Sequence, residues 1–369
     1  MAKSTKTNLP TYVVAMDTGN GLNKIVSDNN KRDHYEAVLG RYTAPQGNTR
    51  MSKRSTATTY RVDSDPQEWV VGYQDIQSYK LEPIPVYSRN SLSRYSQPLF
   101  ATYAKVGLAK AVEGADDMLP ILLVTSTPAY DFHNPGVREQ LNKVFHDLHK
   151  VHVNGERKVI NVVQYEPMSE TEAILYDLYF DDNGEVADEK IADEDVLVIN
   201  CGYGTTDISR YSEMEYIRMD KETLHTSFLD VYKRCSAWLT KALGKQIDIQ
   251  EVARQLEPQK EKKNKSFNFV GTDVENFNEV YDQAIHGVFE DLRTELNSII
   301  DDPDLFNRIV VVGGPVEEWG HLFKNWNSNR VQIPEDPQFA PVRGMYKFGK
   351  FFVIPDLHAA QAEIASTKD

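Results

Sequence analysis

Three short apolar runs in this chain each end in a turn rich in small residues. Residues 12–16 (YVVAM) lead into DTGNG, residues 196–200 (VLVIN) into CGYGTTD, and residues 309–312 (IVVV) into GGP. Short β-branched runs bounded by glycine are typical of buried strands. A glycine turn after a strand offers backbone N–H groups that can bind phosphate oxygens. A single turn of this kind is most simply a tight connection, but three together favour a nucleotide site.

The second half of the chain repeats the pattern of the first. In both halves the glycine turn leads into a further strand candidate, KIVS at residues 24–27 and DISRY at residues 207–211. An acidic stretch, residues 181–195, lies between the halves and is most simply a solvated hinge or loop. A chain of 369 residues exceeds the usual size of one core. We therefore predict two α/β lobes.

Other elements follow from the spacing of apolar residues. Apolar residues at helical spacing predict helices at residues 98–112, 171–180, 228–242 and 277–299. Short apolar runs predict buried strands at residues 121–125 and 159–164. Near the end, YKFGKFFVI at residues 346–354 predicts a strand. The basic segment QKEKKNKS is more simply a solvated surface than a ligand site, and residues 80–96 form an irregular segment.

The composition excludes several classes of function. A formal net charge of −14 disfavours direct binding to nucleic acid, because the average surface repels a phosphate backbone. The two cysteines, Cys201 and Cys235, lie far apart in sequence, which suggests neither a disulfide framework nor a zinc site. No apolar run reaches the ~20 residues of a membrane span, and MAKSTKTNLP lacks the apolar segment of a secretory signal. We expect a cytoplasmic protein that does not bind membranes.

The first turn carries candidate ligands for phosphate and metal. In MDTGNGLNK, Asp17 stands at a strand end where its carboxylate can orient water on a metal, and the turn Gly19, Asn20, Gly21 offers backbone donors. Lys24 follows on the next strand with a point charge for a phosphate. The plain alternative is a hairpin with a solvent-exposed Lys24. No GxxxxGK[ST] motif and no GxGxxG motif opening a helix is present, which removes the nucleotide folds of those types.

Glu166 is the candidate for activating water. In QYEP it follows a buried strand and precedes a predicted helix, where a carboxylate can polarise an attacking water. The alternative role is a negative charge at the N-terminus of that helix.

The order of these motifs resembles the superfamily of actin, sugar kinases and heat-shock-chaperone ATPases. MDTGNGLNK resembles its first phosphate loop, YEP its connecting element, INCGYGTTDIS its second phosphate loop and VVVGGP its adenosine loop. Within the superfamily the chain is most similar to ParM-type bacterial actins. That similarity lies in VVVGGPVEEWGHLFKNW, VRGMYKFGKFF, TSTPAYDFH and VVQYEPMSETEAI.

The resemblance implies a two-lobed, actin-like (ribonuclease H-like) α/β fold with mixed sheets flanked by helices and a nucleotide cleft between the lobes. Domain I would comprise residues 1–192 and 346–369, and domain II residues 193–345. By matching motifs, Asp17 would address the metal and Glu166 the hydrolytic water, with Asp17 also catalytic. The residues expected to bind nucleotide are Gly19, Asn20, Gly21, Lys24, Gly202, Tyr203, Gly204, Thr205, Thr206, Gly313, Gly314 and Pro315.

Two positions depart from the usual pattern of the superfamily. Asn200 stands where an aspartate usually orients water on magnesium, so we expect it to reach the metal through water. Tyr203 and the GGP ending replace commoner small or third-glycine choices.

The function implied by the resemblance is that of an ATPase that polymerises with ATP and Mg²⁺, hydrolyses ATP to ADP, and segregates a plasmid. Its partners would be further copies of itself in a polar, multistranded filament, and a DNA-binding adaptor on a centromere-like site. A sugar or metabolite kinase of the same fold is the first alternative, although no general-base aspartate is evident outside the shared loops. A nucleotide-binding scaffold with little turnover is the second, because of Asn200.

Overall fold

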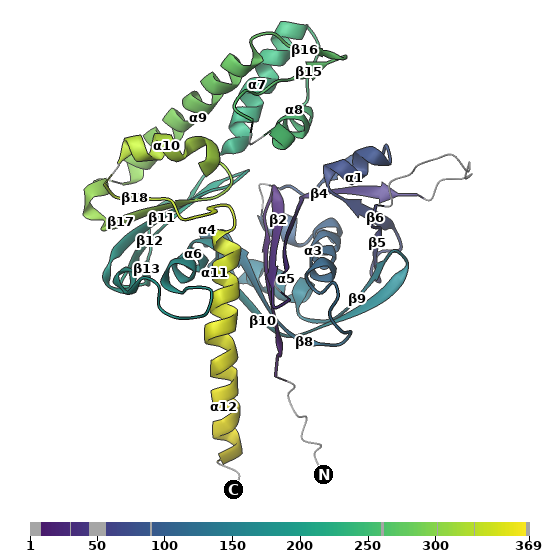
Figure 1. Cartoon of the computed structure of the whole chain (residues 1–369), viewed down its shortest axis with the longest axis vertical. Helices are drawn as coiled ribbons and strands as arrows, with labels where there is room; N and C mark the ends of the chain where they lie inside the picture. Colours follow the sequence, from purple (N-terminus) through teal and green to yellow (C-terminus); the bar gives the residue numbers. More distant parts are fainter. Residues whose placement is uncertain are drawn as a thin grey trace. The chain divides into compact units, whose positions relative to one another are not determined.

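The computed structural model describes residues 9–29, 31–43, 57–88, 91–259, 262–300, 302–327 and 329–366. By its internal contacts the chain divides into two compact units (Figure 1), Met1–Ala192 with Phe339–Asp369, and Asp193–Gln338. The return to the first unit was expected at residue 346, but that position lies inside helix α11 (Ala340–Phe348). Because this helix packs as a whole on the first unit, the return falls at Phe339.

The first unit contains a mixed sheet, which has ten strands in the part of the chain that the structure describes. Their order is β3-β2-β1-β8-β10-β9-β5-β6-β4-β7, and β1, β8 and β10 run parallel. The strands are β1 (Tyr12–Thr18), β2 (Leu22–Ser27), β3 (Lys31–Glu36), β4 (Val38–Tyr42), β5 (Tyr60–Val62), β6 (Glu68–Val71), β7 (Pro83–Pro85), β8 (Pro120–Thr127), β9 (Asp147–Val153) and β10 (Glu156–Ser169).

Helices cover both faces of this sheet at β1. Val14 and Met16 face the core formed with α3 and α5, whereas Val13 and Ala15 face the core formed with α6 and α11. This burial on both faces explains why YVVAM is a continuous apolar run rather than an alternating one. The helices of the unit are α1 (Tyr73–Ser78), α2 (Ser91–Tyr95), α3 (Pro98–Ala111), α4 (Ala129–Phe132), α5 (Pro135–Phe145), α6 (Glu170–Tyr179), α11 and α12 (Ile354–Ser366). A 3₁₀ turn at Glu189–Asp193 follows α6, where the chain passes into the second unit.

The second unit has its own sheet and its own core. The strands β13-β12-β11-β17-β18 form the sheet, β14 pairs with β12, and β15 pairs with β16. The strands are β11 (Asp195–Cys201), β12 (Thr206–Ser212), β13 (Glu215–Ile217), β14 (Thr223–Leu224), β15 (Asn268–Phe269), β16 (Thr272–Asp273), β17 (Arg308–Val312) and β18 (Val331–Gln332). The helices are α7 (Phe228–Leu243), α8 (Ile249–Leu256), α9 (Phe277–Ile299) and α10 (Val316–Trp326), with 3₁₀ turns at Glu257–Gln259 and Pro303–Leu305. The apolar stripes of α7 and α9 pack in one core, as their spacing predicts.

The predicted strand at residues 346–354 is wrong. The segment is helical: α11 continues through a π-helical turn (Gly349–Val353) into α12, drawn in yellow in Figure 1. Val342 and Met345, three residues apart, lie in the core against the sheet. The aromatic residues of the segment stack in the same helical spacing, because Phe348 and Phe352 both contact Tyr176 of α6. Packing on α6 therefore outweighs the strand preference of this aromatic run.

The basic segment QKEKKNKS is only partly a solvated surface. Lys260 and Glu261 lie outside the described residues, but Lys265 is 6% exposed. Its Nζ donates hydrogen bonds to the carbonyl oxygens of Gln259 (2.9 Å) and Lys262 (3.0 Å) and lies 3.1 Å from Glu318. The buried Lys265 side chain thus holds the loop at residues 259–265 in place through that loop's own carbonyl groups.

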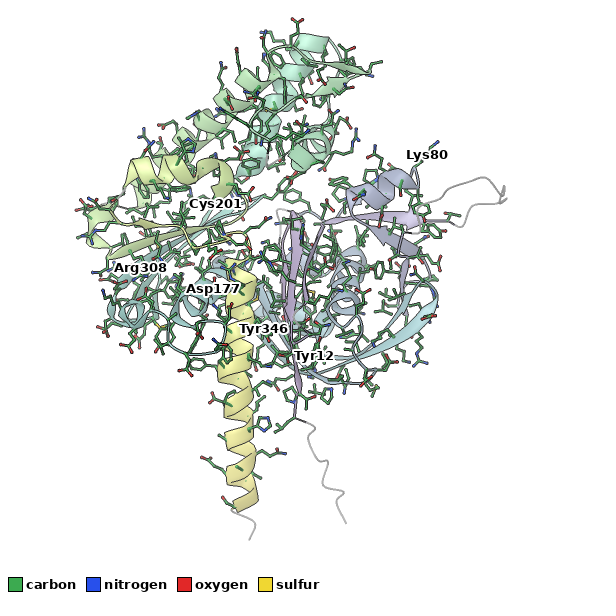
Figure 2. The ribbon with its side chains drawn as sticks, in the orientation of Figure 1. Tyr12, Lys80, Asp177, Cys201, Arg308 and Tyr346 are labelled. Carbon is green, nitrogen blue, oxygen red and sulfur yellow. The ribbon has the colours of Figure 1, made fainter. Side chains whose placement is uncertain are left out.

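Helices α6 and α11 make close contact around Gly344. Arg343 donates to both carboxylate oxygens of Asp177, at 3.0 and 2.5 Å, and Lys347 donates to one of them at 3.0 Å. Asp177 on α6 is labelled beside α11 in Figure 2. A Cβ at Gly344 would overlap the backbone carbonyl oxygen of Ala173. Only glycine lets the two helix backbones approach this closely.

Replacing Gly344 with alanine should destabilise the protein by at least about 2 kcal/mol, because the methyl group meets backbone that cannot rotate away. The measurement is the midpoint of urea unfolding. Gly287→Ala in α9 is the matched control, because its methyl group meets the end of the Arg234 side chain, which is 44% exposed. That control should be neutral or stabilising by up to about 1 kcal/mol. Equal midpoints for Gly344→Ala and the wild type would contradict this account of the helix crossing.

Candidate functional site

The first turn joins two antiparallel strands at a buried ion pair. Asp17 near the end of β1 pairs in register with Lys24 of β2, and Lys24 Nζ lies 2.6 Å from Asp17 Oδ2. Ser126 Oγ of β8 donates to Asp17 Oδ1 at 3.5 Å. Asp17 is 3% exposed and the Lys24 side chain 14%, so the alternative of a solvent-exposed Lys24 is wrong. The structure brings the predicted acid and base of this loop together.

The turn between the two strands is three residues long and tightly closed. A Cβ at Gly19 would lie 2.7 Å from the carbonyl oxygen of Leu22, which explains the glycine there. Gly21 accepts a hydrogen bond from the backbone N–H of Ala37 at 2.8 Å. The Oδ1 atom of Asn20 is buried and has no hydrogen-bond partner among the described residues. An orphaned acceptor of this kind suits a donor or a cation brought by a ligand.

Glu166 lies inside β10, three residues before that strand ends. It pairs with Val124 of β8, and Met168 pairs with Ser126, so Glu166 shares the face of the sheet that carries Asp17. Two strand spacings and two residues separate Glu166 from Asp17, about 10 Å across the strands and roughly 7 Å along them. Gln164 Nε2 donates to Glu166 Oε1 at 2.5 Å.

The alternative role of Glu166 as a helix-end charge does not fit its position. Helix α6 begins at Glu170, and the acidic residues of its first turn are Glu170 and Glu172. Glu166 instead stands on a strand, held by a neighbouring amide, at the same sheet edge as the first turn. The role of Glu166 in activating the attacking water stays a prediction.

The second turn is a hairpin between β11 and β12. The backbone N–H of Gly202 donates to the carbonyl of Thr205 at 2.8 Å, and a Cβ at Gly202 would lie 2.6 Å from that oxygen. Thr206 Oγ1 donates to the carbonyl of Thr226 at 2.9 Å. The carbonyl of Tyr203 accepts the N–H of Leu229 in the first turn of α7, at 2.9 Å. The hairpin is thus anchored to the start of a helix, while Gly204 lies at its tip.

Asn200 has a carboxylate directly across the hairpin. It pairs in register with Asp207, and the two residues are 6% and 2% exposed. Asp207 accepts hydrogen bonds from Thr205 Oγ1 at 3.3 Å and Thr223 Oγ1 at 2.7 Å. The second turn therefore retains a buried acid on the same face as Asn200, one strand away from the position where an acid was expected.

The third turn packs against the second. Gly313 follows β17 with φ +106°, and a Cβ there would overlap the carbonyl oxygen of Cys201 at the end of β11, labelled in Figure 2. The N–H of Gly313 donates to the carbonyl of Pro337 at 2.9 Å. Gly314 is less confined than Gly313, because a Cβ there would meet only the Gln338 side chain, at 3.3 Å, and that side chain can move. Pro315 precedes α10, so the turn ends at a helix N-terminus.

Comparisons with known proteins identify the fold. Residues 15–171 match the family described as actin like proteins N terminal domain. The apo pSK41 ParM structure has a TM-score of 0.70 and 18% identity, covering 93% of this chain and 98% of that one. The chain has the actin-like fold. No curated protein matches its sequence.

Two further similar structures are a filament and a complex with ATP. A 15-stranded ParM filament from Clostridium botulinum gives a TM-score of 0.66 at 18% identity, covering 93% of this chain and 100% of that one. A Bacillus thuringiensis ParM with ATP gives 0.64 at 16% identity, covering 94% and 99%. The fold predicted from the resemblance to ParM-type actins, with mixed sheets flanked by helices, is confirmed.

Two buried residues at these turns were missed in the sequence. Asp207 was within the quoted motif, and the signal for it was the hairpin spacing that places it opposite Asn200. Arg94 lies in the segment 80–96, which has no regular sequence pattern, and it donates hydrogen bonds to the carbonyls of Thr18 and Gly19 at 2.7 and 2.8 Å. A lone arginine among serines and tyrosines carries no sequence signal for such a contact.

Other reactive groups of the actin-like chain lie away from these turns or are inert. Cys201 and Cys235 are free and buried, and burial raises the pKa of both thiols. Within the described ranges, no group of three or more His, Cys, Asp or Glu side chains is placed to hold a metal ion. No helix in the same ranges is long and apolar enough to cross a membrane.

Proposed function

We propose that this chain is an ATPase that assembles into filaments when it binds ATP. The observation that carries the proposal is the first turn of an actin-like fold, whose three residues lie between the ion-paired Asp17 and Lys24. Backbone N–H groups and a lysine at a strand end suit the phosphates of a nucleotide. The structural neighbours with ATP and in a filament support the same function.

In this proposal each unit contributes phosphate-binding turns. Gly19, Asn20, Gly21 and Lys24 bind phosphate in the first unit, and residues 202–206 do so in the second. The turn 313–315 receives the adenosine. When phosphate binds, Lys24 exchanges its carboxylate partner for a phosphate oxygen, which releases Asp17 for a second ligand.

Magnesium is the second ligand in the proposal, and the donor set fits it. Asp17 and Asn20 place two oxygen atoms at the first turn, and one of them, Asn20 Oδ1, has no partner among the described residues. Asn200 adds an amide oxygen, which we propose acts through water. Oxygen ligands at one or two protein positions are typical of Mg²⁺ bound with a nucleotide. When bound, the ion would neutralise charge on the phosphates.

The proposed biological role is segregation of a plasmid or a similar replicon in the cytoplasm. The net charge of −14 disfavours direct contact with DNA, so the proposal includes a DNA-binding adaptor on a centromere-like site. A nucleotide-binding scaffold with little turnover is the second candidate. Asn200 favours it, because an amide replaces a charge that would hold the metal shell.

Sedimentation and phosphate release, measured on the same samples, separate these candidates. The proposal predicts that ATP with Mg²⁺ moves the protein into the pellet and that phosphate is released. Pelleting without phosphate release would identify the scaffold. Phosphate transfer to a sugar without pelleting would identify a kinase, and the absence of both ATP binding and pelleting would contradict the proposal.

Asn200→Asp should tighten the apparent binding of magnesium or speed up ATP hydrolysis. The new carboxylate faces Asp207 across the hairpin, where side chains of paired residues lie about 5 Å apart, so it should lower the melting temperature without ligand. A charge at ~4 Å from an ion is worth about 4 kcal/mol at an effective dielectric near 20, and intervening water reduces this. We expect a several-fold lower magnesium midpoint or faster phosphate release.

The measurement is phosphate release across a magnesium titration. Asn142→Asp on the exposed surface of α5 is the charge-matched control and should leave the titration unchanged. If Asn200→Asp binds ATP and titrates like the wild type, Asn200 only holds the hairpin.

A further inference from the structure

We infer that Arg94 is the positioning residue of the first phosphate loop. It holds the turn so that the backbone N–H groups face outward, and it supplies a buried positive charge under the phosphates. This inference deepens the proposed function and rests on it, because it assigns a role in ATP binding to a residue outside the glycine turns.

Arg94 lies on α2 and is 4% exposed. One nitrogen, Nη2, donates to two successive carbonyls of the turn, those of Thr18 at 2.7 Å and Gly19 at 2.8 Å. Nε donates to the carbonyl of Val86 at 3.3 Å, which fixes the plane of the guanidinium. The hydroxyl of Tyr103 on α3 adds a third donor to the turn, 3.3 Å from the Gly19 carbonyl.

These contacts determine where the N–H groups of the loop point. In a trans peptide the C=O of one residue and the N–H of the next point in opposite directions. The structure contains no cis peptide bond among its described residues. Because Arg94 holds the carbonyls of Thr18 and Gly19 on the protein side, the N–H groups of Gly19 and Asn20 point away from Arg94. Neither N–H has an acceptor among the described residues.

The charge of Arg94 is not balanced by a carboxylate. Within the described residues, no Asp or Glu oxygen lies within 4.0 Å of its guanidinium, and its other neighbours are the rings of Phe100 and Tyr95, centred 5.0 and 5.5 Å away. A buried charge with only carbonyl and aromatic partners is costly. An anion at the outer side of the turn offsets that cost, and the benefit grows with the charge of the phosphate chain.

A positioning role and a purely structural role predict different patterns of binding. If Arg94 only supports the fold, its loss weakens every ligand by the same factor. If it orients the loop and supplies charge, its loss weakens ATP and ADP but spares adenosine, which has no phosphate. The ratio of ATP affinity to adenosine affinity is therefore the decisive quantity.

The experiment measures this ratio by calorimetric titration of the full chain with ATP, ADP and adenosine. Arg94→Met keeps the volume and removes all donors, and we expect its ATP-to-adenosine ratio to fall by a factor on the order of ten or more. Arg94→Lys keeps the charge and a single donor nitrogen, so its ratio should fall less. Arg343→Met is the matched control, since Arg343 pairs with Asp177 between α6 and α11; it should keep the wild-type ratio even if it melts earlier.

If Arg94→Met does not fold, Tyr103→Phe takes its place, because it removes only the hydroxyl donor to Gly19. A smaller fall of the ratio in the same direction is then expected. A wild-type ratio in both Arg94→Met and Arg94→Lys would overturn the inference and leave the ATPase proposal intact. If Tyr103→Phe replaces Arg94→Met, a wild-type ratio in Tyr103→Phe would do the same. Failure of the wild-type protein to bind ATP would overturn the proposed function and this inference with it.

Discussion

Gly313→Ala should abolish ATP-dependent sedimentation and weaken ATP binding by a factor on the order of a hundred. The position has φ +106°, which a residue with a Cβ adopts only at a cost of ~1–3 kcal/mol. The added methyl group would also overlap the carbonyl oxygen of Cys201, so the third turn must move away from the second. In the proposal these two turns act on one nucleotide, and separating them disrupts both contacts.

Gly314→Ala is the control for this prediction. Its methyl group would meet only the flexible Gln338 side chain, at 3.3 Å, so the turn need not move. We expect this variant to fold and to sediment with ATP. The larger Gly314→Val should also fold but lose sedimentation, because the resemblance places this glycine against the adenosine. Wild-type sedimentation of Gly313→Ala would contradict the assignment of the third turn.

Glu166→Ala should lower phosphate release by a factor on the order of 10² while filaments still form and persist for longer. General-base help is typically worth 10²–10⁴-fold, and Glu166 shares its sheet face with Asp17 rather than lying in a phosphate-binding turn. Loss of its carboxylate should therefore affect hydrolysis more than binding. Phosphate release and turbidity after a single addition of ATP measure the two effects separately.

The hydrogen bond from Gln164 supplies an internal test of the same role. Gln164→Ala removes the donor that holds Glu166 at 2.5 Å, and it should slow phosphate release by less than Glu166→Ala does. Glu139→Ala on the surface of α5 is the control and should hydrolyse like the wild type. If Glu166→Ala binds ATP and releases phosphate as fast as the wild type, Glu166 does not activate the water.

The three glycine turns and the buried strands that lead into them could be predicted because their physical requirements leave a local trace. Buried parallel strands need apolar side chains on both faces, as in YVVAM and ILLVT, and tight turns need glycine where a Cβ would collide, as at Gly19 and Gly202. The ion pair between Asp17 and Lys24 was not predicted, because the sequence patterns assigned each residue to a ligand rather than to the other.

What the sequence did not reveal depends on contacts between distant segments. The aromatic run after Met345 has strand preference, and only its packing on α6 makes it helical. Arg94 contacts Thr18 and Gly19 from about 75 residues away, through an arginine that no local pattern distinguishes. Such long-range contacts position the loops, whereas the local patterns only identify them.

The most direct test of nucleotide-driven assembly is negative-stain microscopy of the wild-type protein with ATP and Mg²⁺, beside nucleotide-free and adenosine samples. The proposal predicts filaments with ATP and none in the other two, because a ligand drives assembly only if it binds the assembling state better. Filaments of equal number and length in all three samples, or none with ATP at a concentration that saturates binding, would contradict it.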